Sequence, residues 1–342
     1  MKDEIAPLIF SPEARPLWRM VEPSIWSSPT HASREGPARS ILATLWDQPR
    51  WLEAYHLYDD QGSVLFEEIC ELPEYYLTRT ENAILESEAA HIISAAPVEA
   101  VVELGAGYSK KTTHLLREQV RQRGGGYFAP IDVSLPGLGA ARDAAAENFP
   151  TLRFLGLQGL YEEGFSAVSR DLAKLFVFLG STIGNFNHTD FPRFFRQLSQ
   201  AMGPKDFLLL GADRVKPASI LEPAYDDSQG ITARFILNVF KNVNSLVQSN
   251  FDIDLMRYQA FYNPVWQQIE MYAVATASQE IVFPPFGSSF RWEKDEKILV
   301  EISRKFEPRR LQQQLCYFDL TPIAHYTDRR EWFSLLLFKK AS

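Results

Sequence analysis

Residues 100–107 read Ala-Val-Val-Glu-Leu-Gly-Ala-Gly. The apolar start predicts a buried strand, and Gly105 and Gly107 predict a tight turn in which the backbone can approach a ligand that a Cβ would keep away. A dinucleotide-binding loop would carry a third glycine three residues further on, where this chain has Lys110. The run therefore predicts a ligand-binding turn of another kind, and a turn that only caps its strand is the alternative.

The composition is that of a soluble globular protein. The chain has 342 residues, of which 46% are hydrophobic and 23% charged, enough for one large or two modest domains. A formal net charge of −8 argues against a general nucleic-acid surface, which needs clustered Lys and Arg. No apolar run has the length of a membrane span, and the acidic start at residues 1–4 is unlike a signal peptide. We expect a cytoplasmic protein without nucleic-acid or membrane partners.

The residues that most often bind metals are sparse. The two cysteines, Cys70 and Cys316, are far apart, which argues against a disulfide framework and a cysteine zinc site. The six histidines are scattered without metal-ligand spacing. We expect no catalytic metal.

Strands and helices alternate in the middle of the chain, which predicts an α/β fold with a doubly wound, Rossmann-like parallel sheet. The predicted strands are 99–104, 126–133, 152–158, 174–179 and 205–212, and the predicted helices are 81–95, 110–123, 138–148 and 191–202. The last segment, residues 311–315 followed by 316–321 and 332–339, can return to this sheet. The sheet domain is therefore expected to comprise residues 80–214 and 305–342.

The rest of the chain predicts a second lobe of mixed α+β type. Residues 224–247 look helical, with a break near 228–230, and 268–277, 281–283 and 297–303 look like antiparallel strands. Residues 1–50 are rich in Pro, Ser and Trp and predict an irregular arm, with Trp18, Trp26 and Trp46 as packing residues. The second lobe is therefore expected to comprise residues 1–79 and 215–304.

Polar groups follow three of the predicted strands at the edge where an open α/β sheet binds its ligands. Besides the glycine turn, Asp132 ends the second strand, where it can accept ribose hydroxyls, and a polar loop at 180–185 follows the fourth. The glycine pattern favours S-adenosylmethionine (SAM) over NAD. Glu103 and Asp132 can complement the charge of this sulfonium cation, and Lys111 can hold its methionine carboxylate.

Several longer motifs make the assignment specific. They read YDDQGSVLFEEI at 58–69, LPEYYLTR at 72–79, GSTIGN at 180–185 and VEISRKF at 300–306. Together with the glycine turn they closely resemble the histidine-specific Nα-methyltransferases, in order and in spacing, from about residue 50 to the C-terminus. Those enzymes use SAM to trimethylate L-histidine to hercynine, the first step of ergothioneine biosynthesis. The resemblance implies a SAM-binding Rossmann-like domain and a substrate-binding lobe.

The resemblance also implies the cofactor residues Gly105, Lys111 and Asp132. Family members usually place Asp-Phe beside the adenine, where this chain has Leu160-Tyr161. The change removes a carboxylate acceptor for the adenine amino group, so that a backbone carbonyl or Glu162 is expected to replace it. Tyr161 can still stack on the ring.

For the substrate, the resemblance implies that Asn185 and Tyr225 hold the α-amino and carboxylate groups of L-histidine. The residues expected at the imidazole are Tyr58, Tyr75, Glu301 and Ser303, with Met271 lining the same pocket and Phe66 offering an aromatic face. Glu301 and Ser303 are two residues apart, so that on a strand they face the same side. Tyr58 and Asn185 are expected to act in catalysis. The proton that the amine must lose can leave to water or through a hydrogen-bonded group such as Tyr58 or Tyr75, and the sequence names no clear general base.

Three of these residues also have an ordinary structural explanation, and two other functions remain open. Tyr75 is equally consistent with a core aromatic, Glu301 with an exposed strand residue and Asn185 with the end of a turn. A methyltransferase of the same fold for another amine, such as tryptophan, is disfavoured because an indole ring has no acceptor nitrogen for the Glu301–Ser303 pair. A non-catalytic SAM-binding protein would not need the intact loops. We expect a monomer that releases S-adenosylhomocysteine (SAH).

Overall fold

The computed structural model describes residues 9–29, 35–107 and 109–341. The chain divides into two compact units. The first, the sheet unit, contains the described residues of 1–32 together with 77–215 and 306–342. The second, the substrate-lobe unit, contains those of 33–76 together with 216–305.

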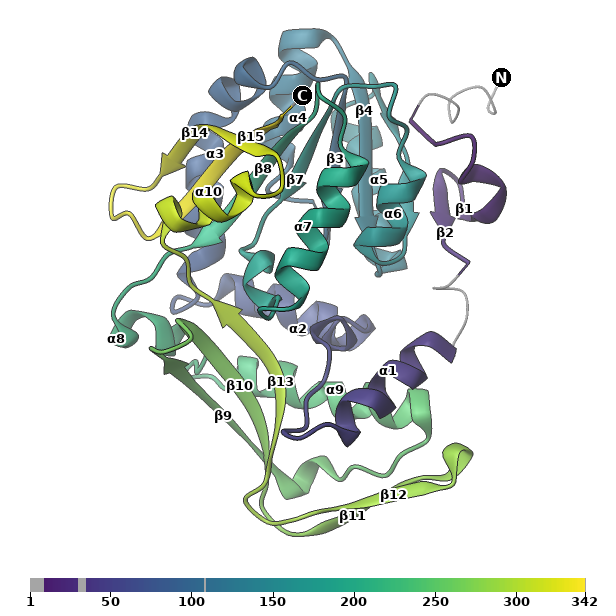
Figure 1. Ribbon diagram of the computed structural model, residues 1–342, viewed down its shortest axis with the longest axis vertical. Coiled ribbons are helices and arrows are strands. Elements are labelled where there is room, and N and C mark those ends of the chain that lie inside the picture. Colours follow the sequence, from purple (N-terminus) through teal and green to yellow (C-terminus); the bar gives the residue numbers. More distant parts are fainter. Residues whose placement is uncertain (1–8, 30–34, 108, 342) are drawn as a thin grey trace. The chain divides into compact units, whose positions relative to one another are not determined.

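The sheet unit is built on one mixed sheet (Figure 1). Its order is β1 (Arg19–Glu22), β2 (Ile25–Ser27), β6 (Gly156–Gln158), β4 (Gly126–Asp132), β3 (Ala100–Leu104), β7 (Lys174–Phe178), β8 (Phe207–Asp213), β15 (Phe333–Lys340) and β14 (Leu320–Thr327), and β5 (Leu152–Phe154) pairs with β4. The strands from β6 to β8 are parallel, and β15 runs antiparallel to both β8 and β14. The chain winds outward in both directions from β3, which confirms the doubly wound sheet and places a topological switch point beside the glycine turn.

Helices cover both faces of this sheet. They are α3 (Tyr76–Ala95), α4 (Thr113–Arg123), α5 (Leu135–Asn148), α6 (Tyr161–Ala167), α7 (Asp190–Ala201) and α10 (Pro308–Cys316). In Figure 1, α7 and α10 lie in front of the sheet, and α3 and α4 lie behind it. Val102 of β3 and Phe178 of β7 pack with Phe194 of α7 in one core, and both strands are buried at every position, as expected for central parallel strands covered on both faces.

The N-terminal arm differs from the prediction, which assigned it to the substrate-binding lobe. Its described residues up to Pro29 belong to the sheet unit, because β2 pairs in parallel with β6 and extends the sheet. Trp18 is buried in the sheet core. The centroid of the Phe10 ring lies 6.2 Å from that of Trp18 and 5.3 Å from that of Trp26. Trp46 belongs to the other unit, where its ring meets Phe283. Residues 1–8, including the acidic start, lie outside the described residues.

The substrate-lobe unit combines helices with antiparallel strands. Its helices are α1 (Glu35–Trp46), α2 (Asp60–Glu71), α8 (Ala218–Leu221) and α9 (Ile231–Val247). Strands β13 (Lys297–Arg304), β10 (Gln268–Ala275) and β9 (Met256–Asn263) form one sheet, and β11 (Gln279–Phe283) pairs with β12 (Ser288–Trp292). The sequence did not predict β9, because most of its residues are half-buried and show no inside–outside alternation.

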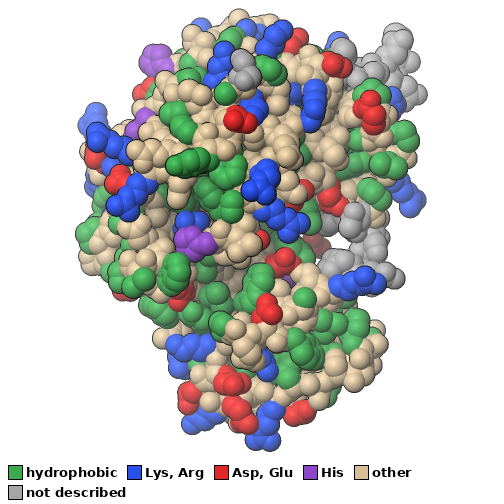
Figure 2. All heavy atoms as spheres, viewed as in Figure 1, with side chains coloured by type: hydrophobic (Ala, Val, Ile, Leu, Met, Phe, Trp, Pro, Cys, Tyr) green, Lys and Arg blue, Asp and Glu red, His purple; other side chains and the backbone are tan. Residues whose placement is uncertain are grey.

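The surface is mixed in charge, as the composition predicts. On the face shown in Figure 2, basic and acidic side chains are interspersed. Within the described parts of the chain, none of the helices is both long and apolar enough to span a membrane.

Candidate functional site

The glycine turn follows β3, whose residues are all buried. Gly105 and Gly107 have φ values of +74° and +48°, in the left-handed region that favours glycine. The Gly105 N–H donates to the Ile131 carbonyl at 2.9 Å, which ties the turn to the end of β4. A Cβ on Gly105 would lie 2.7 Å from the Tyr161 Oη. The backbone conformation and the adjacent phenol therefore both require glycine at position 105.

Asp132 ends β4 beside this turn. Its Oδ2 accepts the Gly107 N–H at 2.9 Å, and its Oδ1 accepts the Ser134 N–H at 2.8 Å. Burial raises the pKa of Asp132, against the lowering effect of these N–H donors. An ionised carboxylate only accepts hydrogen bonds, which is the chemistry that the hydroxyls of a ribose need. The chemistry of Asp132 thus fits the expected cofactor.

Glu103 connects the glycine turn to the start of the next helix: its Oε2 accepts from the Ser109 hydroxyl at 2.7 Å and its Oε1 from the Thr112 hydroxyl. That it complements the charge of a cofactor stays a prediction. The side chain is buried, which raises its pKa from the ordinary 4.5 to about 7 in spite of these two bonds.

The raised pKa of Glu103 predicts a pH-dependent stability. Between pH 4.5 and about 7 the folded state binds the Glu103 proton more tightly than the unfolded state does, so the free energy of unfolding falls as the pH rises through this window. A shift of this size corresponds to about 3 kcal/mol. Urea unfolding is measured at pH 5, 6, 7 and 8 for the wild type and for Glu103→Gln. The free energy of unfolding of Glu103→Gln should increase relative to that of the wild type as the pH rises. A difference between the two proteins that does not change with pH would contradict this.

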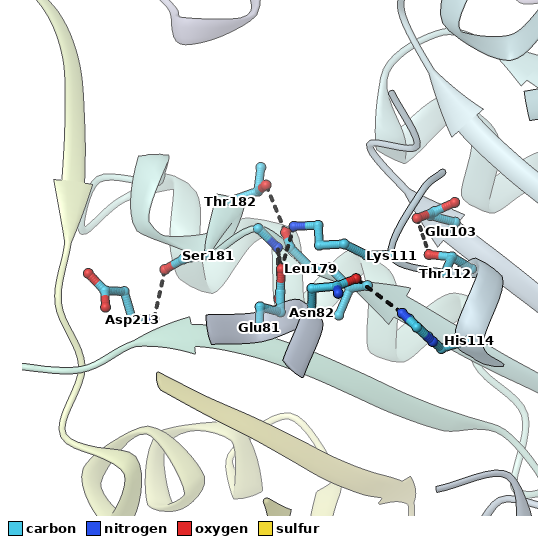
Figure 3. A network of polar contacts seen from close by, with 11 residues as sticks. Glu81, Asn82, Glu103, Lys111, Thr112, His114, Leu179, Ser181, Thr182 and Asp213 are labelled. Carbon is cyan, nitrogen blue, oxygen red and sulfur yellow. Dashed lines mark hydrogen bonds and ion pairs between the residues drawn. The ribbon is translucent and has the colours of Figure 1, made fainter. Parts of the chain in front are cut away.

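Lys111, the residue expected to hold the methionine carboxylate, forms an ion pair with Glu81 of α3 (Figure 3). Glu81 is fully buried, and both of its oxygens accept the Gly180 N–H, at 2.9 and 2.8 Å, at the end of β7. Gly211 of β8 makes room for this carboxylate, because a Cβ there would lie 2.1 Å from the Glu81 Oε1. Glu81 thus connects Lys111 to the loop after β7. The sequence predicted no role for it, because it lies in an ordinary helical pattern.

The residues expected beside the adenine are held in different ways. Leu160 is the N-cap residue of α6 and is 39% exposed, and its N–H donates to Glu163 at 2.8 Å. Its carbonyl accepts the Gly164 N–H at 3.1 Å. Tyr161 packs edge-on against Phe178 and Phe194 with its hydroxyl next to Gly105, and burial raises its pKa. The adenine position of this pair stays a prediction.

The loop after β7 contains a single-turn 3₁₀ helix, η3 (Thr182–Asn185). Gly180 and Ser181 have positive φ values of +73° and +56°. The Ser181 Oγ accepts the Asp213 N–H at 2.9 Å, which ties the loop to the end of β8 (Figure 3). Asn185 ends η3 as a half-buried residue of the sheet unit.

The other residues expected at the substrate all lie in the substrate-lobe unit, and four of them form a chain of aromatic contacts. The ring centroids are 5.6 Å apart for Tyr58 and Phe66, 6.4 Å for Phe66 and Tyr75, and 6.0 Å for Tyr75 and Tyr225. Phe235 of α9 contacts both Tyr58 and Phe66. We call the four residues Tyr58, Phe66, Tyr75 and Tyr225 the aromatic cluster.

The aromatic cluster contacts a polar side chain of β13 through Tyr225. The Tyr225 and Ser303 hydroxyls are 2.8 Å apart, and Met271 of β10 pairs with Glu301 in the sheet register. Burial raises the pKa of Tyr75 well above its ordinary value, and Glu301 contributes to the same shift through its charge. Tyr75 is therefore a neutral phenol at physiological pH, able to exchange hydrogen bonds but not to act as a phenolate base.

Two further residues of this unit were not predicted. The Tyr258 hydroxyl donates to the Tyr225 carbonyl at 2.5 Å, and the Lys305 ammonium donates to the Tyr225 Oη at 2.7 Å and the Ser303 Oγ at 2.8 Å. Lys305 lies in the VEISRKF motif, so the motif contained a signal for it. Tyr258 lies in the unpredicted strand β9.

Cofactor chemistry can be judged from the donor set. A cationic Lys111, the Asp132 carboxylate and a backbone turn with positive φ suit an organic cofactor that carries a carboxylate and ribose hydroxyls. Within residues 9–29, 35–107 and 109–341, no group of three or more His, Cys, Asp or Glu side chains is arranged to hold a metal ion.

The sequence matches known proteins over most of its length. The family described as "Histidine-specific methyltransferase, SAM-dependent" matches residues 37–340. The "Histidine N-alpha-methyltransferase" of Mycobacterium tuberculosis is 36% identical over 88% of this chain and 94% of that protein, and the one of Mycolicibacterium smegmatis is 35% identical over 90% and 95%. The "Ergothioneine biosynthesis protein 1" of Neurospora crassa is 31% identical over 73% of this chain and 30% of that protein. These matches confirm the resemblance seen in the motifs: this chain belongs to the SAM-dependent, histidine-specific methyltransferase family.

Proposed function

We propose that this protein transfers three methyl groups from SAM, one after another, to the α-amine of L-histidine, giving hercynine in the first step of ergothioneine biosynthesis. The observation that carries the proposal is the continuous contact from the aromatic cluster to Ser303, with Met271 and Glu301 paired on neighbouring strands. These are the residues for which the family resemblance implies histidine recognition.

Recognition of the ring rests on two side chains of β13. The Glu301 carboxylate accepts a ring N–H, and the Ser303 hydroxyl addresses the second ring nitrogen, because residues two apart on a strand face the same side. A site whose buried polar groups need partners rejects analogues that lack them by up to roughly 10⁴–10⁵. Phenylalanine and tryptophan cannot satisfy both groups. Tyr225 and Asn185 hold the α-carboxylate and α-amine.

Bound SAM supplies an electrophilic methyl group on a sulfonium. Lys111 holds its carboxylate, Asp132 accepts its ribose hydroxyls, and Gly105 lets the backbone approach it, with Leu160 and Tyr161 at the adenine. Residues of the sheet unit thus orient the donor.

The amine must be neutral to attack, although a free α-amine is largely protonated at neutral pH. Tyr58 and Asn185 accept hydrogen bonds from the amine and direct its lone pair, and Tyr58 passes the departing proton toward water. Tyr75, a neutral phenol, acts only by hydrogen bonding. The faces of Tyr58 and Phe66 favour the ammonium group that becomes more methylated at each step.

The substrate is tested with the purified protein, SAM and each of the twenty amino acids in turn, with SAH release as the readout. We expect release with L-histidine at a rate at least about 100-fold above that with phenylalanine or tryptophan, in line with the discrimination of hydrogen-bonding sites. Turnover with tryptophan alone would favour the alternative amine, and SAM binding without turnover would favour a non-catalytic protein. Either result would overturn the proposal.

Several properties remain predictions from the composition. They are a monomeric state, a cytoplasmic location, independence from metal ions and the lack of nucleic-acid and membrane partners. Light scattering tests the first, and turnover in the presence of a chelator tests the third.

A further inference from the structure

Lys305 follows β13 directly, and its side chain is only 3% exposed. Its Nζ donates to the Tyr225 Oη at 2.7 Å and to the Ser303 Oγ at 2.8 Å, and these two oxygens are themselves 2.8 Å apart. The Nζ also lies 4.5 Å from the centroid of the Tyr225 ring. The ammonium and the two hydroxyls are thus hydrogen-bonded to one another, and we call these three groups the Lys305 triangle.

The donors in this triangle can be counted. A lysine ammonium donates and never accepts, so each of the two hydroxyl oxygens accepts from Lys305. The bond between the hydroxyls uses one of their two protons, and the other proton is directed outside the triangle. The Tyr225–Ser303 pair therefore acts toward its surroundings as an O–H donor. Without the ammonium, either hydroxyl could turn and offer an oxygen instead.

We propose that Lys305 is a positioning residue for histidine: it fixes the Tyr225–Ser303 pair as a donor to an acceptor atom of the bound substrate. The inference rests on the proposed function, which places histidine at these residues. Two atoms of histidine have this acceptor chemistry, the unprotonated ring nitrogen and a carboxylate oxygen.

The ring nitrogen is the acceptor that we expect. Glu301 is two residues from Ser303 on β13 and offers an acceptor on the same side of the strand. A carboxylate acceptor beside a hydroxyl donor matches a neutral imidazole, which has one N–H and one bare nitrogen. An imidazolium has no bare nitrogen, so the Lys305 triangle selects against it. Because Lys305 is charged, its bonds to both hydroxyls are of the stronger, charge-assisted type.

The test compares three ligands on three proteins by calorimetry in the presence of SAH. The ligands are L-histidine, histamine, which lacks the carboxylate, and β-(pyrrol-2-yl)alanine, in which a C–H replaces Nε2 and the only ring nitrogen, at the Nδ1 position, carries a proton and cannot accept. The proteins are the wild type, Lys305→Met, which removes the donors, and Lys305→Arg, which keeps them. The Kd of SAH alone is the control for folding and cofactor binding.

We expect Lys305→Met to weaken L-histidine binding by about 10- to 100-fold, the range for hydrogen bonds to charged groups, and Lys305→Arg to restore part of it. The Kd of SAH should change less than about 2-fold, because the proposed cofactor residues belong to the sheet unit. A ligand without the relevant acceptor should be insensitive to Lys305→Met. Insensitive β-(pyrrol-2-yl)alanine identifies the ring nitrogen, and insensitive histamine identifies the carboxylate; both results support the donor role.

Equal weakening of all three ligands would reduce Lys305 to a packing residue and overturn the inference, as would unchanged L-histidine binding in Lys305→Met. If Lys305→Met does not fold, Lys305→Gln is measured in the same way, with the same pattern expected. A wild type that binds no histidine would overturn the proposed substrate together with this inference. A wild type that binds histidine, with a Lys305→Met variant that binds it equally, would overturn this inference alone.

Discussion

Replacing Glu301 by alanine is expected to lower kcat/KM for L-histidine by about 100-fold or more, with little change in the affinity for SAH. The variant leaves a ring N–H without its acceptor, and a lost hydrogen bond to a charged group together with an unsatisfied buried donor has an effect of this size. Glu301 lies on β13, the edge strand of its three-stranded sheet, and pairs there with Met271 of β10, a backbone pairing that does not depend on the Glu301 side chain. The measurements are steady-state kinetics of SAH release and calorimetric titration of SAH.

Glu301→Gln is the matched control. A glutamine keeps an acceptor oxygen in nearly the same place and removes only the charge. The kcat/KM of Glu301→Gln for L-histidine should therefore lie between those of the wild type and Glu301→Ala. If Glu301→Ala lowered the affinity for SAH as much as it lowered kcat/KM for L-histidine, Glu301 would belong to a different site. If neither changed, the placement of the imidazole at β13 would be wrong.

The second large effect is expected where Glu81 holds Lys111. Glu81→Gln removes the charge that orients the Lys111 ammonium, and Gly211→Ala places a Cβ 2.1 Å from the position of the Glu81 Oε1, which must move. Breaking a buried ion pair destabilises by up to about 3–5 kcal/mol, and partial exposure of Lys111 reduces this to about 2 kcal/mol. We expect both variants to weaken SAH binding by about 10-fold and to lower the free energy of unfolding.

A smaller ligand separates positioning of Lys111 from general damage. Methylthioadenosine has the adenosine part of SAH but no carboxylate, so its affinity should be unchanged in Glu81→Gln and in Lys111→Met, whereas that of SAH falls in both. Gly203→Ala is a control for the glycine change, since the nearest atom to its Cβ would be 3.8 Å away. Equal losses for the two ligands, or unchanged SAH binding in a folded Gly211→Ala protein, would contradict the role given to Glu81.

The sheet could be predicted because its signals are local. A parallel strand covered on both faces reads as a continuous apolar run, and β3, β7 and β8 are buried at every position. Strand β2 gave no such signal. It has three residues and owes its place to pairing with β6, more than 100 positions later in the chain.

The residues of the candidate site could be predicted from the sequence only where the family motifs identify them. The family resemblance identified Tyr58, Tyr75, Tyr225 and Ser303, which the structure connects through ring contacts and a hydrogen bond. Glu81 could not be found in this way, because its partners Lys111 and Gly180 are 30 and 99 residues away and only the fold brings them to it. The hydrogen bonds of Glu103 were hidden for a related reason: the sequence shows a carboxylate before a glycine turn but not that the Ser109 and Thr112 hydroxyls donate to it.

The most direct test of the central claim is the number of methyl groups transferred to histidine and the nitrogen that receives them. Purified protein is incubated with excess SAM and limiting L-histidine until SAH release stops, and the product is fragmented in a mass spectrometer. The account predicts three SAH for each histidine consumed and a product with all three methyl groups on the α-nitrogen. A product methylated on the imidazole ring, a reaction that ends after one methyl group, or no product from histidine would contradict it.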